Sequence, residues 1–260
     1  MTTNQPIKSL FANDIHRRIE EVIKVDQTDE EIIRDEIAEY VVTDAIRTHY
    51  TGIFEAYRET PNKPHEGVAV WVSGFFGSGK SSFAKMLGLS IANRTVAGES
   101  SAERFAERAG DKKLSVLLKA ITEKIPTHAV IFDVSTDRGI RSGNQTLTEI
   151  MYGLFLQSLG YAKDLDLSEL EIGLEEKGEL RKFEDEYTRL FKKAWAAEKG
   201  KVAFALSEAS RVLHSLDPDT YPMADSWVKA VKNKADITPG KLAERAGELM
   251  KRRKPGRSLM

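Results

Sequence analysis

The residues best suited to chemistry form one glycine-rich stretch, Gly74-Phe-Phe-Gly-Ser-Gly-Lys-Ser-Ser82. It matches the pattern G-x-x-x-x-G-K-[ST], in which backbone N–H groups surround phosphate oxygens. Gly77 and Gly79 let the chain wrap closely, because a side chain at either position would block the anion. Lys80 supplies a mobile positive charge for the β- and γ-phosphates, and the Ser81 hydroxyl completes the shell of Mg²⁺. The stretch therefore predicts a phosphate-binding loop.

The cofactors predicted for this loop are ATP and Mg²⁺. No motif that reads the base accompanies the loop, so GTP stays an open alternative. Lys80, which reaches the γ-phosphate, is also a predicted catalytic residue, and Ser81 is the predicted metal ligand. The predicted nucleotide-binding residues are Gly74, Phe75, Phe76, Gly77, Ser78, Gly79, Lys80, Ser81 and Ser82.

Hydrolysis needs, in addition, a carboxylate at a strand end that holds the water shell of the metal. After the loop, one place offers four apolar residues followed by an acid, Ala129-Val-Ile-Phe-Asp133. Val134 comes next, so the adjacent glutamate of many ATPases is absent. Asp133 is therefore either the metal-side carboxylate, and then a second catalytic residue, or a structural residue that ends a neighbouring strand.

The elements expected to position the loop alternate between strand and helix over residues 67–160. Val68–Val72 is a short apolar run typical of a buried parallel strand, and a helix is predicted from Ser81 to about Asn93. Helical material follows around 102–124, and a second buried strand is predicted over His128–Val134. This order predicts an α/β fold with a parallel-sheet, P-loop nucleotide-binding core.

In such a sheet, ligands collect beyond the carboxyl ends of the strands. The loop 136–141 is therefore expected near the nucleotide. Arg138 and Arg141 in this loop are either phosphate sensors or partners in loop salt bridges.

The two flanks of this core read as helical. Residues 1–66 are predicted to be an amino-terminal helical cap, and residues 161–260 a helical segment with a solvated, charged face. Thr238-Pro239 has the chemistry of a helix start, and the helix it opens is predicted to end before Pro255. The basic stretch 251–257 either contacts DNA phosphates or complements the dipole of that last helix.

Composition narrows the class of protein further. The 260 residues carry 39 Lys+Arg against 40 Asp+Glu, so the net charge is −1 and an extensive nucleic-acid coat is not expected. There is no cysteine, which excludes disulfides, thiol catalysis and cysteine-ligated metals. No run of about 18 apolar residues predicts a membrane span. A cytoplasmic location is the expectation, since a secretory signal pattern is also missing from the first residues.

Three stretches of the sequence together resemble one protein family. They are Asp26-Gln-Thr-Asp29, Glu39-Tyr-Val-Val-Thr43 and Val72-Ser-Gly-Phe-Phe-Gly-Ser-Gly-Lys-Ser81. They are similar to the amino-terminal part of the BrxC/PglY P-loop proteins of BREX systems, which exclude bacteriophages from bacteria and archaea. The resemblance covers roughly residues 7–160, and the Phe-Phe pair inside the loop is its most distinctive part. Ser82 departs from the family, whose members commonly have histidine there.

The resemblance implies an ATP-binding subunit of the AAA-like P-loop class. Its implied partners are a BrxB-type protein, a PglZ-type protein and a DNA methyltransferase. Family chains are several times longer, so the sequence is expected to be an amino-terminal portion that binds nucleotide, with ATPase activity belonging to the full-length protein. The leading function is a switch or motor subunit of a phage-defence complex. The alternatives are a stand-alone phosphotransferase and a nucleotide-stabilised assembly scaffold, and a homo-oligomer is left open.

Overall fold

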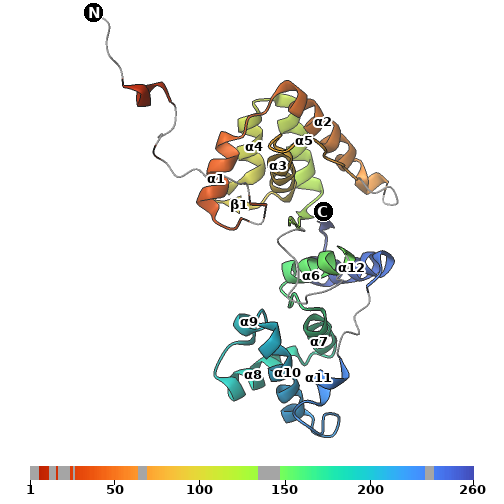
Figure 1. The fold of residues 1–260 in the computed structure, drawn as a ribbon. Coiled ribbons are helices and arrows are strands. Elements are labelled where there is room, and N and C mark those ends of the chain that lie inside the picture. The colour runs from red at the N-terminus through yellow and green to blue at the C-terminus, as the bar shows by residue number, and fades with distance from the viewer. Residues whose placement is uncertain are drawn as a thin grey trace, which may run out of the picture.

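The chain folds into three groups of helices that follow one another along the molecule (Figure 1). The computed structural model describes residues 6–11, 16, 24–25, 27–63, 69–133, 147–231 and 237–260. Each group has its own core of buried side chains. The amino-terminal group contains the glycine-rich loop, and the other two groups are built from the second half of the chain.

The amino-terminal group packs five helices around one apolar core. Asp29 caps α1 (Glu30–Glu39) by accepting from the N–H groups of Glu31 and Ile32. The core includes Phe54 and Leu117, both nearly inaccessible. The elements are η1 (Ile7–Leu10), α1 (Glu30–Glu39), α2 (Asp44–Arg58), η2 (Thr60–Asn62), α3 (Lys80–Ala92), β1 (Thr95–Val96), β2 (Glu99–Ser100), α4 (Ser101–Ala109) and α5 (Lys112–Lys124).

The middle group joins two helices that are far apart in the sequence, α6 (Leu147–Ser158) and α12 (Pro239–Arg253). The Thr238 side chain accepts from the N–H of Lys241, which confirms the predicted start of the last helix. Beyond α12 the chain forms β4 (Ser258–Leu259), which pairs in parallel with β3 (Thr127–His128). This pairing ties the end of α12 to the amino-terminal group.

The carboxyl-terminal group contains α7 (Leu165–Glu176), α8 (Leu180–Phe191), α9 (Trp195–Glu198), α10 (Val202–Leu216) and α11 (Ser226–Ala230). Its core has the aromatic residues Phe183, Tyr187 and Trp195 at the centre, with their rings in edge contact around Trp195. The charged stretch thus buries one apolar stripe and exposes its other face, as predicted. Among the described helices, none combines the length and apolarity needed to cross a lipid bilayer.

The predicted parallel-sheet core is wrong. The described residues form mainly helices, with two separate sheets of two short strands each. Residues 69–72 are extended but belong to neither sheet, and Trp71 is 91% exposed. Residues 129–133 also lie outside the strands. The ladder of β3 and β4 ends with the hydrogen bond from the Val130 N–H to the Met260 carbonyl, at 2.8 Å. A strand needs a neighbour for its backbone groups, and an apolar sequence cannot supply one.

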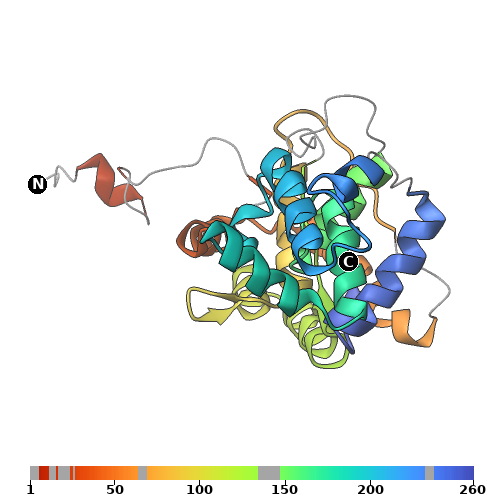
Figure 2. The ribbon, with the colours of Figure 1, turned by 90° about the horizontal axis from the view of Figure 1, so that it is seen from below.

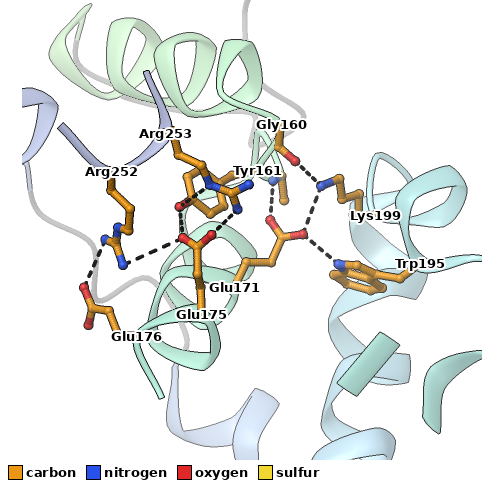
Figure 3. Close-up of polar contacts among 10 residues, drawn as sticks. Gly160, Tyr161, Glu171, Glu175, Glu176, Trp195, Lys199, Arg252 and Arg253 are labelled. Atoms are coloured by element: carbon orange, nitrogen blue, oxygen red, sulfur yellow. Dashed lines mark hydrogen bonds and ion pairs between the residues drawn. The ribbon is translucent and has the colours of Figure 1, made fainter. Parts of the chain in front are cut away.

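A buried carboxylate on α7 joins this helix to α9 and to the residues before α7 (Figure 3). Glu171 of α7 is 2% exposed and accepts from Trp195 Nε1 at 2.7 Å. It also accepts from the N–H of Ala162 at 2.5 Å and from Lys199 Nζ at 3.0 Å. Three donors, one from Ala162 before α7 and two from α9 and its cap residue Lys199, therefore converge on one side chain, which offsets the cost of burying its charge.

We expect Glu171→Ala to lower the free energy of unfolding by about 3–5 kcal/mol, because the buried indole N–H of Trp195 would lose its acceptor and the partly buried Lys199 ammonium would lose its carboxylate. Glu176→Ala is the matched control on the same helix, since Glu176 is 53% exposed and pairs with Arg252 at 3.1 Å. It should cost no more than about 1 kcal/mol. Urea denaturation followed by tryptophan fluorescence measures both, and equal losses for the two variants would contradict this role.

Candidate functional site

The glycine-rich loop forms a tight turn that leads directly into α3. Gly77 and Gly79 have φ angles of 77° and 84°, in the left-handed region that glycine adopts without strain. The N–H of Ser78 donates to the Phe75 carbonyl at 3.2 Å. A Cβ atom on Gly74 would lie 2.6 Å from Ser78 Oγ, so a side chain at position 74 would require the Ser78 hydroxyl to rotate away. Two glycines of the predicted motif, Gly77 and Gly79, therefore have a conformational reason at their positions.

The first turn of α3 lies open at its amino end. Gly79 occupies the cap position, and no side chain accepts a hydrogen bond there. The first N–H groups of a helix have no partner within the helix, and they carry the positive end of its dipole. A loop of glycines before such a turn is the arrangement that binds phosphate in proteins.

The Lys80 side chain folds back over the loop. Its ammonium group donates to the carbonyl oxygens of Gly74 at 3.0 Å and of Phe75 at 2.8 Å. These contacts hold a positive charge against the backbone of the turn, on its solvent side. Ser81 and Ser82 follow in the first turn of α3. The structure therefore keeps the loop residues, the charge and the helix start within one short segment.

A cavity of about 1020 Å³ lies beside this turn. The loop contributes Ser78, Gly79 and Lys80 to its lining. The opposite walls come from α1, from α2 and from the extended residues 70–73. The other lining residues are Asp29, Glu31, Ile32, Asp35, Glu36, Glu39, Tyr40, Val41, Ile46, His49, Ile53, Val70, Trp71, Val72, Ser73, Ser82, Phe83 and Met86. Lys80 adds a positive charge to the lining. The α1 helix adds carboxylates, of which Glu31 and Asp35 pair with Arg34 and Glu36 pairs with Lys85.

Two buried interactions fix α3 against its neighbours, and the sequence indicated neither of them. Lys85 is 1% exposed, forms an ion pair with Glu36 of α1 and donates to the Lys24 carbonyl at 2.6 Å. Tyr50 of α2 donates to the Phe83 carbonyl at 2.9 Å and stacks on the Phe83 ring with centroids 4.4 Å apart. Burial raises the pKa of the Tyr50 hydroxyl, which keeps it a neutral donor.

Lys85 was the one signal in the sequence for this buried ion pair, because it is a charged residue among the apolar residues on the buried face of α3. Its partner Glu36 could not be chosen from the sequence, since α1 carries several carboxylates on one helix.

The structure does not bring the predicted carboxylate to the loop. Asp133 is exposed and does not line the cavity beside Lys80. Its predicted position depended on a strand over 128–134 next to a strand over 68–72. In the described parts of those segments, residues 69–72 and 129–133 form no strand, and β3 includes only His128. Arg138 and Arg141 lie outside the described residues.

Two arginines of the basic stretch 251–257 contact α7 (Figure 3). Arg253 pairs with Glu175 at 2.7 Å and lies over the Tyr161 ring, with its guanidinium carbon 4.4 Å from the ring centroid. Arg252 pairs with Glu176 at 3.1 Å. These contacts give the two arginines a structural task in joining α12 to α7.

No family model matches the chain, and no solved structure matches it.

We expect Gly79→Ala to lower the free energy of unfolding by about 1–2 kcal/mol, because alanine disfavours the left-handed conformation that this position requires. Gly52→Ala is the matched control, since Gly52 lies exposed within α2 and a Cβ atom there meets nothing within 4 Å. It should raise stability by about 0.5–1 kcal/mol. Thermal or urea unfolding distinguishes the two signs. A stabilising Gly79→Ala would mean that the loop does not adopt this turn.

Proposed function

We propose that the chain binds ATP with Mg²⁺ at the loop Gly74–Ser82. The observation that supports this most is the turn itself, in which two left-handed glycines precede an uncapped helix start and a lysine side chain lies over the loop. The residues present fit a polyphosphate, because Gly79 leaves the amino end of α3 without a side-chain cap. The neighbouring cavity has the size of the clefts that hold small ligands and cofactors.

In this proposal three groups of the loop and of the first turn of α3 contact the nucleotide and its metal. The Lys80 ammonium exchanges the carbonyls of Gly74 and Phe75 for phosphate oxygens. The N–H groups at the start of α3 donate to the same anion, and the Ser81 hydroxyl is a ligand of the metal. Magnesium neutralises phosphate charge when it is bound.

The proposal covers binding and a nucleotide-dependent switch, with hydrolysis assigned to a longer chain. Asp133 does not line the cavity, so the described residues give no support to its role as the metal-side carboxylate. The resemblance to the BrxC/PglY proteins supports a role as the ATP-binding subunit of a BREX defence complex. The partners proposed on that basis are a BrxB-type protein, a PglZ-type protein and a DNA methyltransferase.

Lys80→Ala should weaken binding of a fluorescent ATP analogue by at least about tenfold in the presence of Mg²⁺, because a charge-assisted contact to phosphate is lost. Lys119→Ala is the control for the loss of one positive charge, since Lys119 is 77% exposed on α5 and should bind the analogue like wild type. Fluorescence anisotropy titration at fixed ionic strength measures the three affinities. Equal affinity of wild type and Lys80→Ala would refute the proposed site.

The metal ligand is tested separately with Ser81→Ala. Wild type should bind the analogue more tightly with Mg²⁺ than with EDTA, because the metal joins the phosphates to the Ser81 hydroxyl. In Ser81→Ala this difference should shrink by several-fold, while affinity in EDTA stays near that of wild type. If the magnesium dependence were unchanged in the variant, Ser81 would not be a ligand.

A further inference from the structure

An aromatic side chain beside the glycine-rich loop has its ring open to solvent. Trp71 is 91% exposed, and it lines the same cavity as Lys80. Gly74 follows it by three positions, so the Cα atoms of these two residues are at most about 11 Å apart. In both views the turn η1 stands apart from the helical groups, so its apolar side chains do not cover this indole (Figure 1 and Figure 2). The Trp71 ring is therefore available to a ligand that lies in the cavity and reaches the loop.

The other phenylalanine and tyrosine rings that line the cavity belong to the core of the amino-terminal group. Among the described residues these are Tyr40 and Phe83. Phe83 stacks on the Tyr50 ring with centroids 4.4 Å apart, and Tyr40 meets the same ring edge-on with centroids 6.4 Å apart. Trp71 is thus the described ring of this lining that a ligand covers without disturbing the core.

We propose that Trp71 stacks on the base of the nucleotide whose phosphates bind at Gly74–Ser82, an inference that rests on the proposed function. A nucleotide carries its base on the far side of the ribose from its phosphates, so a base in the cavity is compatible with phosphates on the loop. A cavity of about 1020 Å³ has the size of sites that enclose whole small ligands, which leaves room for the base and the ribose.

The stacking contact identifies the chemical class of the ligand more closely than the loop does. The loop recognises phosphate alone, and a simple polyphosphate would leave the Trp71 ring in water. Every base has a π-face, so an indole stacks on adenine or guanine without reading hydrogen bonds. The site therefore takes a base-bearing nucleotide in preference to tripolyphosphate.

The test compares ATP with inorganic tripolyphosphate, each with Mg²⁺, by isothermal titration calorimetry of the full chain. Trp71→Ala should weaken binding of ATP by at least about fivefold, the lower end of the effect of removing an aromatic ring that stacks on a base. The affinity of this variant for tripolyphosphate should equal that of wild type, because this ligand has no base. Trp71→Phe should retain most of the ATP affinity, since a phenyl ring still stacks.

Tryptophan emission gives a second readout. Trp195 and Trp227 are 1% and 7% exposed, so a change of emission on adding ATP to wild type should come from Trp71, and it should be absent in Trp71→Ala. Phe204→Ala is the matched control, because Phe204 is 68% exposed on α10 and does not line the cavity. It should bind both ligands like wild type.

Two results would overturn the inference and leave the proposed function standing. In the first, Trp71→Ala binds ATP as tightly as wild type does. In the second, the variant loses affinity for ATP and for tripolyphosphate by the same factor, which would mean that Trp71 supports the loop and not the base. If wild type binds neither ligand, the proposed function itself fails, and this inference fails with it.

Discussion

The position of α3 depends on one buried charge. Lys85 lies on the apolar face of that helix, and an ammonium group in such a place must be paired, because an isolated buried charge is very costly. Glu36 provides the opposite charge from α1, and the Lys24 carbonyl accepts a further hydrogen bond. Since Glu36 also lines the cavity, the same contact sets the distance between the cavity wall and the first turn of α3. The packing of α3 against α1 therefore fixes the position of the loop, while the glycines of the loop determine its backbone path.

The amino-terminal group is in turn joined to the rest of the molecule through the last helix. Arg252 and Arg253 attach α12 to carboxylates of α7, and beyond α12 the residues Ser258–Met260 pair with the chain at β3. Residues 129–132 and 258–260 line one groove together with the apolar side of α3. Arg252 and Arg253, two of the charges in the stretch that the sequence left open as a DNA contact, thus connect two helical groups.

Local features were predictable from the sequence, and non-local ones were not. The helix start at Thr238 and the turn before α3 each depend on a few adjacent residues, since capping and left-handed glycines act within one turn. A strand depends on a partner elsewhere in the chain, so the apolar run at 68–72 was compatible with a sheet without requiring one. The pairing of Lys85 with Glu36 has the same limitation, because nothing near either residue identifies the other.

The same contrast between local and non-local features applies to the proposed binding residues and to the predicted catalytic carboxylate. The turn proposed to bind phosphate lies within the nine residues 74–82, and it forms although the described residues build no parallel sheet around it. A metal-side carboxylate at Asp133 would have needed the neighbouring strand to bring it to the loop, and the described fold does not supply that strand. The proposed binding site therefore depends on adjacent residues, whereas a catalytic carboxylate would depend on a contact between distant parts of the chain.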